Sequence, residues 1–179
     1  YNFQQSTGSY SEITGGTVVA TATGTTGAAS LDDVIYDLPT GTIPFSFTFN
    51  SVAYTGCKIS TNGFITFGTT APSANGSTTG YTPLSATTAY SGAASPLGRN
   101  LNAYFFAGSP TTTGEIRYQT LGSSPNRTFV IQWKNFKTFN TSGATFGPVL
   151  NFQVRLSESS NAVEFKYNCS GSFASSPSQ

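Results

Sequence analysis

The chain has 179 residues, a net charge of +1 and only 8% charged residues, against roughly 25% in an ordinary soluble domain. Aromatic residues reach 14%, and serine and threonine are abundant. The basic residues are scattered singly, which excludes the clustered lysines and arginines of nucleic-acid binding. No apolar run approaches the ~18 residues of a membrane span. Because histidine is absent, a Ser-His-Asp triad and His-ligated metal sites are excluded as well. This composition favours β-structure.

Residues 1–19 are β-prone, with Glu12 as their one charge. Residues 20–30 (ATATGTTGAAS) follow without charge or large side chains and are expected to form a flexible tether. Eleven extended residues span about 35 Å, which would let the first segment complete a neighbour's sheet by strand addition. The alternative is an N-terminal strand paired within its own sheet. The residues that would carry a donated strand are Tyr1, Phe3, Tyr10, Ile13 and Val18.

Asp32, Asp33 and Asp37 form the densest acidic cluster. Their oxygens are of the type that binds Ca²⁺, and paired carboxylates also serve acid–base catalysis in glycosidases. The simpler interpretation is that they solvate the ends of a strand over 34–38. The sequence supplies no other candidate catalytic group, and we expect no enzymatic activity and no required cofactor.

Alternation of apolar and polar residues predicts β-strands over most of the remaining chain. It is clearest over 43–50, 129–134, 150–156 and 163–167, and shorter strands are expected at 17–22, 34–38, 54–60, 64–67, 103–107 and 115–121. Asn62-Gly63 is a strong hairpin signal. About ten short strands without a credible helix predict a single antiparallel β-sandwich of jelly-roll or Ig-like type over residues 1–169. A closed barrel is the alternative.

Residues 68–100 predict a long loop rich in Gly, Ser, Thr, Ala and Pro, with sparse aromatic anchors. Tyrosines here and just beyond, with neighbouring asparagines, suggest a platform on which a sugar could stack. The candidate glycan-binding residues are Tyr81, Tyr90, Asn100, Asn102 and Tyr104. The alternative is an ordinary surface loop whose aromatic side chains pack against the domain.

Cys57 and Cys169 are the only cysteines, and we expect them to form a disulfide, with two unpaired thiols as the alternative. Residues 170–179 (SGSFASSPSQ) are typical of a linker. Asn-x-Ser/Thr triplets at Asn75, Asn126, Asn140 and Asn168 accept glycans only if the source organism has the machinery.

Six segments appear in this order along the chain: YNFQQSTGSYSEITGGTVV, the 45–49 strand, ISTNGFITFG, EIRYQTLG, NRTFVIQWKNF and NFQVRLSESSNAVEFKY. In this the sequence resembles the N-terminal β-sandwich modules of secreted Bacteroidota surface proteins, particularly flavobacterial ones exported by type IX secretion. The resemblance implies export, a cell-surface or extracellular location, and adhesive or structural roles. The start of the sequence has no basic n-region and no apolar h-region, so we expect any signal peptide to be already removed. The resemblance supplies no catalytic residues. Such proteins usually end in a C-terminal sorting domain, which does not follow Tyr167.

Charge is divided along the chain, because residues 1–57 hold Glu12 and the three aspartates and no base, whereas all 8 Lys and Arg come later. Head-to-tail contact between copies would juxtapose opposite fields. A heterologous interface that does not close gives a filament. The sequence therefore suggests a structural or adhesive subunit that forms a homopolymer by strand exchange. A carbohydrate-binding module with glycan partners is the alternative.

Overall fold

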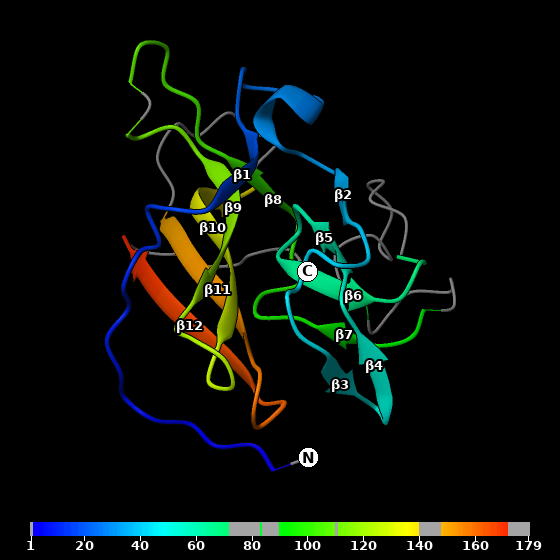
Figure 1. The fold of residues 1–179 in the computed structure, drawn as a ribbon. Helices are drawn as coiled ribbons and strands as arrows, with labels where there is room; N and C mark the ends of the chain where they lie inside the picture. The colour runs from blue at the N-terminus through cyan, green and yellow to red at the C-terminus, as the bar shows by residue number, and fades with distance from the viewer. Residues whose placement is uncertain (1, 72–82, 84–89, 110, 140–147, 172–179) are drawn as a thin grey trace.

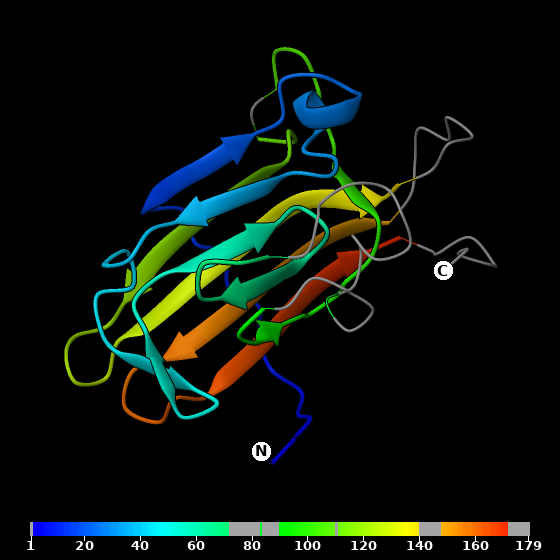
Figure 2. The same ribbon diagram turned by 90° about the vertical axis from the view of Figure 1, so that its right-hand side faces the viewer.

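The computed structural model describes residues 2–71, 83, 90–109, 111–139 and 148–171. Their regular structure consists of antiparallel strands in two facing sheets and a hairpin (Figures 1 and 2). The predicted all-β, sandwich-type fold is confirmed. The short 3-10 helix η1 spans Gly27–Ser30. No helix there is long and apolar enough to cross a membrane.

The larger sheet contains the longest strands. Its order is β1-β9-β10-β11-β12, and β8 pairs with the end of β10. β10 shifts register between Trp133 and Phe136, and past this point β8 takes the place that β9 holds beside the first half of β10. The strands are β1 (Thr17–Thr21), β8 (Leu101–Ala103), β9 (Glu115–Leu121), β10 (Thr128–Thr138), β11 (Val149–Ser157) and β12 (Val163–Ser170).

The smaller sheet has the order β2-β5-β6-β7, and a separate hairpin joins β3 to β4. The strand expected at 54–60 is divided at Gly56, where the backbone passes so close to Leu38 that a Cβ would lie 2.6 Å from its carbonyl oxygen. The elements are β2 (Ile35–Leu38), β3 (Phe47–Phe49), β4 (Val52–Tyr54), β5 (Cys57–Ser60), β6 (Phe64–Phe67) and β7 (Ala93–Ala94).

The hydrophobic core fills the space between the sheets, as the alternation predicts. Phe129, Ile131 and Trp133 of β10 are all fully buried. Trp133 stacks on Phe152 with ring centroids 5.0 Å apart. Its Nε1–H donates to the carbonyl oxygen of Ser60, 3.0 Å away in the smaller sheet. One side chain therefore both fills the core and connects the two sheets.

Residues 20–30 do not form the expected flexible tether. The backbone N–H of Ala22 donates to the carbonyl of Gly114 at 2.9 Å, and the N–H of Thr23 donates to that of Ala29 at 2.7 Å. Both Ala22 and Leu31, just after the 3-10 helix, are buried in the core. Ala22, Ser30 and Leu31 are buried at the two ends of the segment, residues 25–29 between them are exposed, and the backbone hydrogen bonds fix its path. Composition alone suggested mobility because it does not reveal such packing.

The expected disulfide is absent, because Cys57 and Cys169 are both free. Cys57 begins β5 and is buried between the sheets, where burial raises the pKa of its thiol to about 12. Cys169 is exposed near the end of β12. β5 begins at the opposite end of the sandwich from the end of β12 (Figure 2). The separation of the two thiols follows from strand direction, which the spacing of cysteines in the sequence does not give.

Candidate functional site: a clamped segment on the outer face

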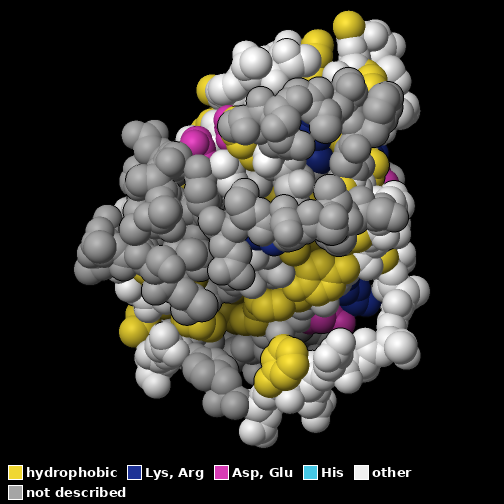
Figure 3. All heavy atoms as spheres, turned by 180° about the vertical axis from the view of Figure 1, so that it is seen from behind, with side chains coloured by type: hydrophobic (Ala, Val, Ile, Leu, Met, Phe, Trp, Pro, Cys, Tyr) yellow, Lys and Arg dark blue, Asp and Glu magenta, His cyan; other side chains and the backbone are white. Residues whose placement is uncertain are grey.

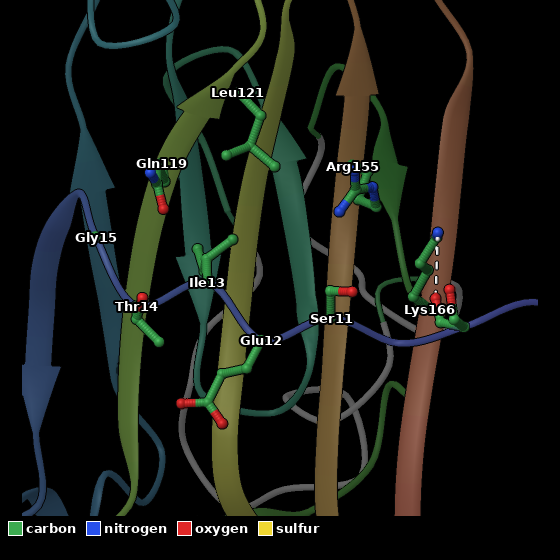
Figure 4. A pocket seen from close by; sticks show the side chains of 10 residues that line it. Ser11, Glu12, Ile13, Thr14, Gly15, Gln119, Leu121, Arg155 and Lys166 are labelled. Atoms are coloured by element: carbon green, nitrogen blue, oxygen red, sulfur yellow. Dashed lines mark hydrogen bonds between the residues drawn. The ribbon is translucent and has the colours of Figure 1, made fainter.

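Residues 9–16, which we call the strap, run across the outer face of the larger sheet, away from the core. The strap crosses over β12, β11, β10 and β9 instead of running along them (Figure 4). It leads into β1, which pairs with β9. The N-terminal segment therefore makes two kinds of contact: β1 extends the sheet, and the strap covers it.

Two buried glutamines hold the strap by its backbone. Gln132 and Gln153 lie opposite each other on β10 and β11, and both are fully buried although they point away from the core. Oε1 of Gln132 accepts from the N–H of Ile13 at 2.9 Å, and its Nε2 donates to the carbonyl of Ile13 at 3.3 Å. Nε2 of Gln153 donates to the carbonyl of Ser11 at 2.8 Å and to Oε1 of Gln132 at 2.8 Å. The Gln132 amide thus presents to the strap the same donor–acceptor pair that a neighbouring strand would.

Basic side chains on the outer face add further contacts. Nζ of Lys134 lies 2.5 Å from a carboxylate oxygen of Glu12. The guanidinium of Arg117 donates to the carbonyls of Thr14 and Gly15 at 2.6 and 3.1 Å, while Glu115 holds its other nitrogens. Except at Glu12, these groups recognise main-chain carbonyls, so the face binds an extended backbone more than a particular sequence.

The strap ends in a sharp turn at Gly16, which has a φ of +78°. A Cβ at this position would lie 2.1 Å from the carbonyl oxygen of Tyr118. Only glycine accommodates both the left-handed backbone and this close approach. Gly16 is therefore the fixed corner between the strap and β1.

A groove of about 340 Å³ runs beside the strap, with Gln119, Leu121 and Arg155 among its lining residues (Figure 4). Tyr10 inserts its hydroxyl toward Gln132, to which it donates at 3.2 Å, and burial raises the pKa of this phenol. Ile13 is buried on the same face. The arrangement can hold an extended peptide by its backbone and accept one apolar side chain.

The candidate strand-donation residues separate into different environments. Tyr10 and Ile13 belong to the strap, and Val18 lies in β1 opposite Arg117 of β9. Phe3 is 88% exposed on the arm that precedes the strap. Tyr1 lies outside the described residues. The structure thus places residues 17–21 as a strand within their own sheet, which was the alternative, and shows the strap as a separate crossing segment.

The three aspartates do not converge on one point, and no group of three His, Cys, Asp or Glu side chains that could hold a metal ion occurs within the described ranges. Asp37 pairs with Lys58 at 3.1 Å. Asp33 accepts a hydrogen bond from Nδ2 of Asn62 at 3.0 Å. These contacts are structural, and the Ca²⁺ hypothesis gains no support.

Asp32 predicts a pH dependence of stability. Burial, followed by the nearby charge of Asp33, raises its pKa to about 6 from 3.8. The folded state therefore binds this proton more tightly, and stability falls as pH rises from about 4 to above 6. We expect Asp32→Asn to stabilise the protein by about 1 kcal/mol at pH 7, after discounting for its partial exposure.

Urea unfolding at several pH values tests this expectation. The difference between Asp32→Asn and the natural chain should vanish below about pH 3, where Asp32 is protonated in both states. Asp37→Asn, at an exposed ion pair, is the control and should give no gain at pH 7. A loss of stability in Asp32→Asn at pH 7 would contradict the assignment.

The described residues of the predicted sugar platform do not offer a stacking surface. Tyr104 is only 7% exposed, and the Nζ of Lys137 lies 4.9 Å from the centroid of its ring. The hydroxyl of Tyr90 donates to the carbonyl of Pro83. The side-chain oxygens of Asn100 and Asn102 are buried without a hydrogen-bond partner. Tyr81, much of the 68–100 loop and residues 172–179 lie outside the described part. No stacking surface is therefore assembled from Tyr90 and Tyr104.

Sequence reasoning missed Gln132, Gln153 and Arg117 as functional residues. All three alternate with apolar residues along their strands, a pattern that predicts solvent-facing positions. Two glutamines directly opposite each other on adjacent central strands are the one signal that could have pointed to a buried polar pair. Nothing local shows that residues 9–16 cover them.

Together, the fold and the clamp define a β-sandwich module that binds an extended segment on its outer face. The chain belongs to the family described as NIDO related, whose model matches residues 1–179. Membership indicates an extracellular domain of adhesive type. Searches of curated proteins and of solved structures find no match.

Proposed function

We propose that this chain is a non-catalytic structural or adhesive subunit, secreted and displayed at the cell surface, whose strap is exchanged between copies to link them head-to-tail into a filament. The observation that carries the proposal is the clamp on the outer face. The strap is held through hydrogen bonds between its main-chain atoms and the side chains of Gln132, Gln153 and Arg117. The strap of a neighbouring copy can therefore make the same contacts. Exchange of an identical element is a low-cost route to assembly.

The ionisable groups support a non-catalytic role. Most carboxylates of the chain are engaged in ion pairs with nearby bases: Glu12 with Lys134, Asp37 with Lys58, Glu115 with Arg117, Glu158 with Arg127, and Glu164 with Arg155. Arg127 holds the pKa of Glu158 at about 2, well below its usual range, by hydrogen bonding. Glu158 is therefore kept charged, and all five of these acids are engaged by a base. The pairs of Glu12 and Asp37 also show that the acidic first third of the chain is partly neutralised within one copy.

A carbohydrate-binding module is the weaker proposal, because Tyr104 is buried and covered by Lys137. The type IX route of export belongs to the leading proposal through the sequence resemblance alone. Both ideas are compatible with an extracellular family.

Exchange of the strap is tested by cross-linking between two differently marked full-length chains, each carrying Cys169→Ser. One chain has Glu12→Cys and the other Lys134→Cys, because these two side chains meet in the structure. After unfolding and refolding together, a short bis-maleimide should join the two kinds of chain, and negative-stain images should show filaments. A matched mixture of Glu12→Cys with Lys58→Cys controls for random collision. Monomers alone, with no cross-link between the two kinds of chain at any concentration, would refute exchange.

A further inference from the structure

The edge of the larger sheet at β12 is open. In the described part of the chain β12 pairs with β11 alone, so the other side of this strand presents unpaired backbone N–H and C=O groups. β12 has 8 residues, Val163–Ser170. An open edge strand of this length is a template for pairing with another chain.

The side chains of β12 are divided between two faces. Val163, Phe165 and Tyr167 lie opposite the core residues Leu156, Val154 and Phe152, yet Tyr167 is 46% exposed and the other two are only partly buried. Figure 3 shows hydrophobic side chains gathered in a band on the rear of the molecule, next to a basic and an acidic group. The smaller sheet therefore leaves part of this apolar face uncovered, as at many interfaces.

The outward face of β12 carries opposite charges two residues apart. Glu164 has a half-exposed carboxylate 3.0 Å from Arg155 and 3.6 Å from Lys166. When two copies of such a strand pair antiparallel, only a register centred on Phe165 sets Glu164 of each copy opposite Lys166 of the other. The same register sets Phe165 against Phe165 and Val163 against Tyr167. Registers centred on Glu164 or Lys166 oppose like charges, which is unfavourable.

We propose that two copies of this chain pair antiparallel through their β12 strands, in the register centred on Phe165, to form a two-fold dimer with one continuous sheet. The self-complementary charges select this partner and this register, because a two-fold interface requires each patch to match itself. This pairing goes beyond strap exchange and does not depend on it.

Sedimentation velocity of the full chain over a range of concentrations tests the dimer. Glu164→Lys and Lys166→Glu should each raise the dissociation constant at least about tenfold, since each creates like-charge pairs twice in the interface. The double variant should return it to within about threefold of the natural chain. The same exchange at the exposed pair Asp37 and Lys58, on the smaller sheet, is the control and should leave the dimer unchanged.

Disulfide trapping tests the register separately. In a Cys169→Ser background, Phe165→Cys places two thiols directly opposite each other, at a Cα separation of about 5 Å that suits a disulfide, so mild oxidation should give a covalent dimer. The natural chain should not cross-link through Cys169, because that residue faces Asn161 of the second copy. Circular dichroism checks that each variant is folded. The proposal would be overturned if the chain were monomeric at all concentrations, or if neither charge reversal changed the dissociation constant of the dimer. If the dimer forms but no strap exchange is detected by cross-linking, only the proposal of a filament would be overturned.

Discussion

Trp133→Ala is expected to destabilise the fold by about 4 kcal/mol, the largest effect of any single substitution considered, because it empties the centre of the core. Trp133 is fully buried and stacks on Phe152. A loss of this size is a large part of the 5–15 kcal/mol that stabilises a typical domain. Urea unfolding followed by circular dichroism measures it, since the variant lacks the one tryptophan of the chain.

Trp133→Phe separates the packing of the ring from its hydrogen bond. The carbonyl of Ser60 accepts both from Trp133, at 3.0 Å, and from the N–H of Gly63, at 3.2 Å. It therefore keeps one partner in Trp133→Phe, and we expect a loss of only about 1–2 kcal/mol. If both substitutions cost the same, the hydrogen bond between the sheets and not the packing would be the dominant contribution.

The contrast between core and strap shows how far sequence alone reaches. The alternation over 129–134 predicts that Phe129, Ile131 and Trp133 share one face of a strand, and all three are fully buried. Alternation is a local property of a strand, so it can be recognised in the sequence before the tertiary fold is known. β7, with Ala93 and Ala94, was missed because two small residues carry no alternation.

The clamp could not be predicted for the opposite reason. The contact between Ile13 and Gln132 joins residues 119 positions apart. Whether an outward glutamine is solvated or buried depends on which distant segment covers it. The same limit explains the cysteines, because their separation is set by strand order and direction. Local pattern thus gave the inner faces of the sheets, and long-range contacts determine the outer face, where the candidate site lies.

Gln132→Ala is expected to cost about 2–4 kcal/mol and to release the strap. It removes the partners of the N–H and the C=O of Ile13 and of the Tyr10 hydroxyl, and a buried polar group without a partner costs about 1–3 kcal/mol. The loss of stability has an upper limit, because the strap detaches from the sheet once detachment costs less free energy than leaving these polar groups buried without partners. Hydrogen exchange should show loss of protection at the amide of Ile13, while the amides of β10 and β11 stay protected.

Gln119→Ala is the matched control for Gln132→Ala. Gln119 has the same side chain, lines the same groove and lies on the neighbouring strand β9, where its amide packs beside Gly15 but makes no hydrogen bond to the described strap backbone. It should change stability by less than about 0.5 kcal/mol and leave the strap protected. In the cross-linking assay, Gln132→Ala should lower the yield between Glu12→Cys and Lys134→Cys chains, because the vacated face no longer holds a strap from any copy. An Ile13 amide that stays protected in Gln132→Ala would show that the clamp does not hold the strap, and would remove the structural basis for exchange.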